Sequence, residues 1–164
     1  MSREFDFLTP AYFAAMAGLW QRAQAARGVA TSAEDQTATL ELLRERATKS
    51  DAWFAGSWSD GRLVAIVHGA NARSNDGAGE SVAGLMHLSM VAVDPDRWGR
   101  GIGRAATSFA LTQARVRGYD AVQLWAHLHN TRARRLYESF GFIASGRRKR
   151  DGPGSEILHY VLTL

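Results

Sequence analysis

The stretch that decides the fold of this chain is Val93-Asp94-Pro95-Asp96-Arg97-Trp98-Gly99-Arg100-Gly101-Ile102-Gly103-Arg104. It follows an apolar, strand-like run and leads into a segment with helical periodicity. Glycines at alternate positions between strand and helix allow positive φ angles and let the backbone approach a ligand closely. The amides of such a turn, together with the unpaired N–H groups at the start of the helix, form a cradle for an anion. The stretch therefore predicts a phosphate-binding loop.

The glycine stretch does not match two familiar kinds of phosphate-binding loop. A tight turn that binds no ligand is the alternative to a phosphate-binding loop. A Walker loop ends in Gly-Lys-Ser/Thr, whereas this chain has Gly103-Arg104-Ala105. The dinucleotide fingerprint matches the glycine spacing, but it should follow directly from a strand, and Asp94 to Arg100 intervene here. The next strand also ends in His129-Asn130 rather than in an acid that would hold a ribose. Taken alone, the glycines are also compatible with a tight strand-to-helix turn.

A second segment, Leu124 to Phe142, reads as strand, loop, short helix and turn. Asn130 or Thr131 can cap the helix, and Gly141 ends it. Together with the glycine loop, this segment resembles the GNAT superfamily of acyl-CoA-dependent N-acetyltransferases. The signature of that family is a Val-x-Pro strand end, a Gln/Arg-x-x-Gly-x-Gly/Ala loop, Asn-x-x-Ala-x-x-x-Tyr and Gly-Phe. The resemblance covers residues 83–146 closely and the rest in outline.

The resemblance implies an α/β fold of the GNAT type and acetyl-CoA as cosubstrate. That fold has a central mixed, mostly antiparallel sheet with a splayed parallel strand pair and helices on both faces. Pantetheine would pair with the strand end before the loop, and the pyrophosphate would sit on the loop amides. The Gln or Arg of the family falls at Trp98, so a side-chain contact there does not follow. The implied cofactor-binding residues are Val91, Ala92, Val93, Trp98, Gly99, Arg100, Gly101, Ile102, Gly103, Arg104, Asn130 and Tyr137.

The implied reaction is direct attack of a primary amine on the thioester within a ternary complex. Tyr137 stands where the family places its proton donor, and a phenol with a pKa of about 10 can protonate a departing thiolate; a buried aromatic on the core face of the helix is the alternative. The amine must lose a proton, and His87 falls where some family members carry a glutamate base. Glu80, His127, Ser89 and a water molecule stay open as bases.

Length and composition agree with a single globular domain over residues 1–164, with 46% hydrophobic and 22% charged residues. The chain has no cysteine, which excludes disulfides, thiolate metal sites and an acetyl-cysteine intermediate. His127 and His129 have no supporting ligand set, so we expect no metal. No apolar run reaches about 18 residues, and Asp6, Arg22 and Arg27 interrupt the first apolar segment. We therefore expect neither a membrane span nor a signal peptide, and a cytoplasmic location.

The basic residues do not indicate a nucleic-acid partner, although the net charge is +4. They are spread over helix faces, apart from Arg147-Arg148-Lys149-Arg150, which lies beside the turn sequence Asp151-Gly152-Pro153-Gly154. We interpret this cluster as a solvated hairpin tip, with contact to an acidic substrate or to the cofactor phosphates as the alternative.

The expected partner is a small-molecule or peptide amine. In the family, the acceptor pocket is built by the connection of the first two helices and by the last hairpin, here residues 27–36 and 147–155. A non-catalytic acyl-CoA sensor or scaffold remains the alternative function, and a homodimer is left open.

Periodicity and turn signals predict the remaining elements. The expected strands and helices are a strand Glu4–Leu8, helices Pro10–Ala26 and Ala33–Thr48, a hairpin of Ala52–Trp58 and Leu63–Ala70 around Asp60-Gly61, a polar loop 71–81, a strand Val82–Val93, a helix Ile102–Arg117, a strand Ala121–His127, and an antiparallel pair Phe142–Gly146 and Ile157–Leu162. Thr31 or Ser32 can cap the second helix. The succession of strand, long helix and strand before His127 implies a right-handed parallel crossover.

Overall fold

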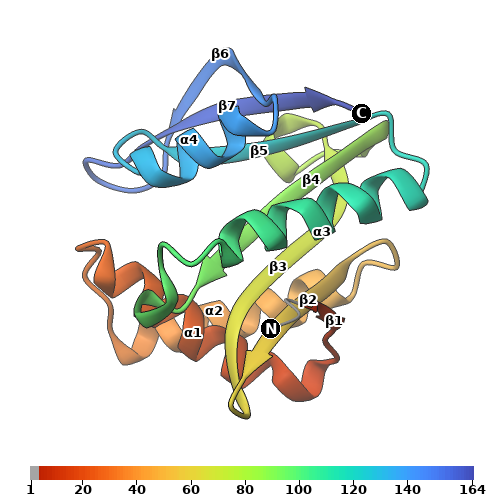
Figure 1. Ribbon diagram of the computed structural model, residues 1–164. Coiled ribbons are helices and arrows are strands. Elements are labelled where there is room, and N and C mark those ends of the chain that lie inside the picture. The colour runs from red at the N-terminus through yellow and green to blue at the C-terminus, as the bar shows by residue number, and fades with distance from the viewer. Residues whose placement is uncertain (1–3) are drawn as a thin grey trace. The chain divides into compact units, whose positions relative to one another are not determined.

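The strands join into one mixed sheet. The computed structural model describes residues 4–164, and its helices are α1 (Phe13–Ala26), α2 (Ala33–Ala47), α3 (Ile102–Val116) and α4 (Thr131–Ser139) (Figure 1). The strands are β1 (Asp6–Phe7), β2 (Trp53–Ser59), β3 (Arg62–Arg73), β4 (Ser81–Val93), β5 (Ala121–His127), β6 (Ile143–Arg150) and β7 (Glu156–Thr163). Their order is β1-β2-β3-β4-β5-β7-β6. The pair β4–β5 is parallel, whereas β1–β2, β2–β3, β5–β7 and β6–β7 are antiparallel, which confirms the predicted mixed sheet.

The chain forms two compact units. Unit 1 comprises the chain up to Ala70 together with Met90–Ala110, and unit 2 comprises Asn71–Ser89 together with Leu111–Leu164. Strands β3 and β4 and helix α3 have residues in both units. The single domain predicted from the sequence stays a prediction.

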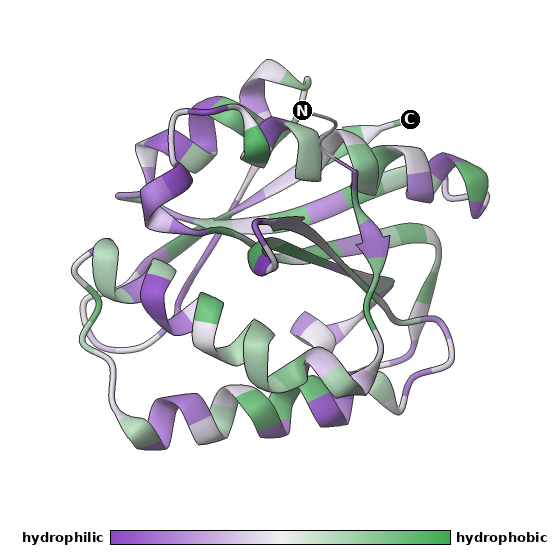
Figure 2. Ribbon diagram, turned by 60° about the horizontal axis from the view of Figure 1, so that its bottom comes forward, coloured by the Kyte–Doolittle hydropathy of each residue, from purple (hydrophilic) through white to green (hydrophobic). Residues whose placement is uncertain are grey.

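Unit 1 holds α1, α2 and the antiparallel strands β1, β2 and most of β3. The turn between β2 and β3 is Asp60-Gly61, whose φ angles of +52° and +73° suit the two-residue turn predicted for Asp-Gly. Ser32, one of the two caps that the sequence allowed, caps α2 through a capping box with Asp35. Figure 2 shows hydrophilic and hydrophobic residues alternating along the helices. The hydrophobic core of the unit includes Leu8, Phe13, Met16, Ala17, Leu19, Ala23, Leu43, Phe54, Leu63, Ile66, Met90 and Ala92.

Unit 2 is built around β5, which lies between β4 and β7. The parallel ladder joins Leu85–His87 to Ala121–Gln123, in agreement with the predicted crossover through α3. The antiparallel ladder with β7 extends along the whole of β5, to His127. The ladder to β4 thus covers only the first part of β5. Helix α4 contacts β5, and β6 and β7 form the final hairpin.

Several element boundaries differ from the predicted ones. The first strand is short, and Pro10–Tyr12 form a 3-10 turn before α1. Strand β3 continues to Arg73, so the polar loop is shorter than predicted. Strand β6 continues past Gly146 to Arg150. The prediction that the basic cluster forms a hairpin tip is therefore wrong. Gly146, with a φ of +87°, lies in a register shift after which the strand resumes.

Candidate functional site

The glycine loop of unit 1 has the backbone geometry expected of an anion cradle. Gly99 and Gly101 have φ angles of +75° and +76°, which only glycine adopts at little cost. Helix α3 begins at Ile102, directly after them. Among residues 4–164, no acceptor is recorded for the amides from Gly99 to Gly103. The loop therefore presents unsatisfied donors at the positive end of the α3 dipole, and it is not closed on itself.

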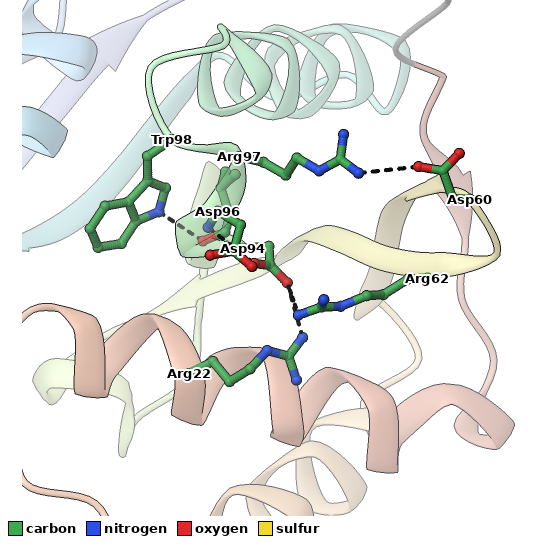
Figure 3. Close-up of polar contacts among 8 residues, drawn as sticks. Arg22, Asp60, Arg62, Asp94, Asp96, Arg97 and Trp98 are labelled. Carbon is green, nitrogen blue, oxygen red and sulfur yellow. Dashed lines mark hydrogen bonds and ion pairs between the residues drawn. The ribbon is translucent and has the colours of Figure 1, made fainter.

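A buried carboxylate anchors the strand end that leads into this loop. Asp94 is 2% exposed, and one of its oxygens accepts from Arg62 at 2.6 Å and from Arg22 at 3.2 Å (Figure 3). Its other carboxylate oxygen accepts from the amide of Asp96 at 3.2 Å, and its own amide donates to the Val64 carbonyl at 2.8 Å. Asp94 thus ties the start of the loop to α1 and to β3. Sequence reasoning missed this cluster.

Trp98 and Arg97 add two further attachments to the same segment (Figure 3). The indole nitrogen of Trp98 donates to the Val93 carbonyl at 2.8 Å, and Arg97 pairs with the exposed Asp60 at 3.1 Å. Trp98 therefore folds back on the strand end. The family resemblance implies that pantetheine pairs with backbone groups at this strand end. The Val93 carbonyl already accepts from Trp98 and keeps one lone pair for another donor.

Strand β4 carries an unusual backbone angle just before the predicted cofactor strand. Met90 has a φ of +53° and is buried. A left-handed conformation is rare for a residue with a large side chain, and strain of this kind concentrates at functional sites. Beyond it, Ala92 is buried, whereas Val91 and Val93 are partly exposed. The assignment of these three residues to the cofactor stays a prediction.

Unit 1 also has a cavity between α1 and α2, of about 280 Å³. It includes Thr31 and Asp35, which lie in the helix connection predicted to build the acceptor pocket. The buried Oε1 atom of Gln21 in its wall has no hydrogen-bond partner among the described residues. The other lining residues are Trp20, Gln24, Val29, Ala30, Ala38, Thr39 and Leu42.

Unit 2 holds the predicted acid on α4. Tyr137 is 7% exposed, and its ring packs edge-on against Phe142 at 5.8 Å between centroids. Asn130 accepts from the amide of Ala133 and so caps the helix, as the sequence allowed. Gly141 ends it with a φ of +95°. The packing and capping roles are observed, and the roles in acid catalysis and cofactor binding stay predictions.

The predicted base and the alternative bases lie in two places, one face of strands β4 and β5 and the loop before β4. His87 lies opposite Gln123 in the parallel ladder, and Ser89 is two residues further along the same side of β4. His127 lies on the corresponding side of β5, with Nδ1 2.9 Å from the Ser155 hydroxyl. Glu80 is exposed in the loop before β4. The structure thus brings three of these side chains to one face of unit 2 and leaves Glu80 outside it.

This face of unit 2 also carries an aromatic and basic cluster. The Lys149 ammonium lies 4.5 Å from the ring centroid of Trp125, and the Arg147 guanidinium lies 5.3 Å from it. The His159 ring stacks at a tilt on Trp125, with 4.9 Å between centroids. Burial, reinforced by the charge of Arg147, lowers the pKa of His159 below its ordinary value. We call Trp125, Arg147, Lys149 and His159 the Trp125 cluster.

No group of three or more His, Asp or Glu residues in residues 4–164 is arranged to hold a metal ion. None of the helices in this part of the chain is both long and apolar enough to cross a membrane.

Comparison with known proteins shows that the sequence matches the acetyltransferase (GNAT) family. A profile of the acetyltransferase (GNAT) family matches residues 16–142. A mycothiol acetyltransferase from Beutenbergia cavernae is 37% identical over 126 residues, covering 71% of this chain and 38% of that protein. The chain thus spans well under half the length of that relative.

Two solved structures resemble the fold as a whole. The ribosomal-protein-S18-alanine N-acetyltransferase from Escherichia coli has a TM-score of 0.76 at 21% identity, covering 98% of this chain and 92% of its own. The PaiA N-acetyltransferase from Thermoplasma acidophilum, solved in complex with coenzyme A, has a TM-score of 0.74 at 15% identity and covers 100% of both chains. These likenesses confirm the predicted GNAT fold.

Proposed function

Because the chain belongs to the acetyltransferase (GNAT) family, we propose that it transfers an acetyl group from acetyl-CoA to a primary amine by direct attack. The observation that carries the proposal is the glycine loop, whose amides from Gly99 to Gly103 have no recorded acceptor in the described chain and precede α3. A diphosphate has the charge and the oxygen acceptors that such a loop binds. The same loop in a chain without catalysis would still bind coenzyme A, so binding alone does not distinguish an enzyme from a sensor.

The chemistry requires one proton acceptor and one proton donor. The amine nitrogen forms a bond to the thioester carbonyl carbon, the carbon–sulfur bond breaks, and coenzyme A leaves as the thiol. We assign His87 as the general base that accepts the amine proton and Tyr137 as the general acid that protonates the sulfur. The partial exposure of His87 supports its assignment, with Nε2 as the accepting nitrogen because Nδ1 is buried. Both roles come from the family motif and remain proposals.

The acceptor class is the least constrained part of the function. The relatives at 37% identity are named mycothiol acetyltransferases, so a mycothiol-related amine belongs among the first acceptors to test. Because the chain spans only 38% of that relative, its name does not carry over. A cytoplasmic location and a homodimer remain predictions from the sequence.

Two measurements test the proposed function. Calorimetry with coenzyme A and acetyl-CoA should show micromolar-range binding, which the Gly101→Ala variant weakens. Thiol release from acetyl-CoA should then be followed across a panel of amines, and at least one amine should accelerate it. Binding without acceleration by any amine would favour the sensor. No binding would contradict the assignment of the loop.

A further inference from the structure

We propose that the Trp125 cluster recognises an anionic group, a carboxylate or a phosphate, on the acetyl acceptor. The inference rests on the proposed acetyl transfer and names the class of its second substrate: a primary amine that also carries a negative charge. Every residue that it uses belongs to unit 2.

The first step is that the cluster lies on an accessible face of the strands. Burial alternates along β5, where Val122, Leu124 and Ala126 are buried and the side chains between them are partly exposed. Trp125 belongs to the partly exposed set. Lys149 pairs in register with Ile157, which in turn lies opposite His127, so the three are in one row across the strands. A ligand that approaches this face meets the indole ring and the two cations above it.

The second step is that Lys149 has no ion pair of its own on this face of the described chain, although Asp151 lies 3.6 Å from Nε2 of the neighbouring His127. Arg147 has a carboxylate partner in Asp76 at 2.8 Å. Lys149 is partly buried, and within residues 4–164 no carboxylate lies at ion-pair distance from its ammonium group. Two like charges share one aromatic ring, and one of them lacks a counter-ion. A partly desolvated ammonium in this position is stabilised by an anion that can reach it.

The third step is that the neighbouring histidine is held neutral. Burial and the Arg147 charge lower the pKa of His159, so it adds no positive charge near neutral pH. Its Nε2 lies 2.9 Å from the side-chain oxygen Oε1 of Gln123, and its Nδ1 lies 2.7 Å from the Ser145 hydroxyl. A neutral ring fits both contacts if Nε2–H donates to Gln123 and Nδ1 accepts from Ser145. The ring nitrogens of His159 are thus occupied, so the donors for a ligand at this cluster are the Lys149 ammonium and the remaining N–H groups of Arg147.

The fourth step links the anion site to the reacting end of the acceptor. Gln123 faces His87 across the parallel ladder, and Trp125 is two residues further along the same side of β5. Two residues of a strand span about 7 Å. His87 and Trp125 lie on neighbouring strands about 5 Å apart and are offset by this length. An acceptor with its amine near His87 and its anionic group beside Trp125 therefore needs a separation of at least about 8 Å. Other occupants fit less well: a cationic group would be repelled by Lys149 and Arg147, and an apolar group would bury the ammonium without a partner.

The test uses matched amines that differ only in charge at the far end. We would compare 6-aminohexanoic acid with 6-aminohexanamide, and include 5-aminopentyl phosphate to separate carboxylate from phosphate recognition. The natural protein should acetylate the charged amines with a higher kcat/KM than the amide. Lys149→Gln should lower kcat/KM for the charged amines by about tenfold, the factor expected for a charged hydrogen bond. It should leave the amide, and the KM for acetyl-CoA, unchanged.

Arg150→Gln is the matched control, because it removes the same charge from the neighbouring position on the opposite side of β6. Arg150→Gln should leave kcat/KM unchanged for both the charged amines and the amide. Lys149→Glu should reverse the preference in favour of the amide. Equal losses for charged and neutral amines, or a rise in the KM for acetyl-CoA alone, would overturn the inference.

Calorimetry separates this inference from the proposed function. Lys149-dependent binding of 6-aminohexanoic acid without thiol release from any amine would support the anion site and contradict acetyl transfer. Acetyl transfer with the same kcat/KM for charged and neutral amines would support the proposed function and contradict the anion site. If the charged amines neither bind nor react, the inference is wrong.

Discussion

Asp94 provides the sharpest test of how this fold holds its glycine loop. Replacing it with asparagine keeps the shape of the side chain and removes its charge. The two guanidinium groups of Arg22 and Arg62 then lose the carboxylate on which they converge, and the segment before the loop loses its link to α1 and β3 (Figure 3). The variant should be less stable and should bind acetyl-CoA less tightly.

The size of the stability loss follows from the exposure of the partners. Breaking a fully buried ion pair costs about 3–5 kcal/mol. Here the Asp94 side chain is 3% exposed, but those of Arg22 and Arg62 are 44% and 54% exposed, so water can solvate the released cations. We therefore expect a loss of about 2 kcal/mol for Asp94→Asn, in the range for charged hydrogen bonds. Asp94→Ala should cost about 1 kcal/mol more because the Asp96 amide loses its cap.

Thermal unfolding and steady-state kinetics would measure both effects. A loss of 2 kcal/mol lowers the Tm by about 4–8 °C for a domain of this size. The KM for acetyl-CoA should rise several-fold at a temperature well below the Tm, with a smaller change in kcat. The matched control is Asp60→Asn, since Asp60 pairs with Arg97 on the same segment but its side chain is 78% exposed. This control should lose less than about 0.5 kcal/mol.

Two outcomes would refute the reasoning. If Asp94→Asn unfolds at the same temperature as Asp60→Asn, the buried cluster contributes no net stability. If the Tm falls while the KM for acetyl-CoA stays constant, Asp94 stabilises the unit but does not position the loop.

Three further predictions concern single side chains. Tyr137→Phe should lower kcat by about a hundredfold, as expected on removal of a general acid, with an unchanged calorimetric Kd for acetyl-CoA; a matching loss of affinity would indicate a packing role. Gly101→Ala should cost about 1–2 kcal/mol, because a Cβ is strained at a φ of +76°, and denaturant unfolding would detect it. The lowered pKa of His159 means that the unfolded chain binds its proton first as the pH falls. The contribution of His159 to the free energy of unfolding should therefore be fully present above about pH 6.5 and be lost as the pH falls below it. In His159→Gln, the free energy of unfolding should decline less steeply with falling pH. Urea unfolding at several pH values would measure both, and the same pH dependence in the two proteins would contradict the prediction.

The elements that the sequence predicted well are those with local causes. The Asp60-Gly61 turn, the Ser32 cap and the Gly141 helix end each depend on residues a few positions apart. The parallel pair of β4 and β5 followed from strand, long helix and strand in succession. The glycine loop belongs to the same class, because its backbone angles are set by the glycines themselves.

What the sequence could not predict depends on residues far apart along the chain. Asp94 meets Arg22 across 72 positions and Arg62 across 32, and each arginine alone resembles an ordinary surface residue. The positive φ of Met90 has no local signature, since methionine gives no reason to expect a left-handed backbone. No periodicity or turn motif carries information of this kind, so a fold is needed to reveal it.

The basic cluster at the end of the chain illustrates how one misplaced strand boundary changes a functional interpretation. At a hairpin tip, all four cations would be solvated and equivalent. In β6, alternation places Lys149 over Trp125, whereas Arg148 and Arg150 lie on the opposite side, where Arg148 meets Glu156. The cluster is therefore divided into a pair that shares an aromatic ring and a pair that does not. The different effects expected for Lys149→Gln and Arg150→Gln follow from this division, because the two variants have the same net charge and differ in the face they alter.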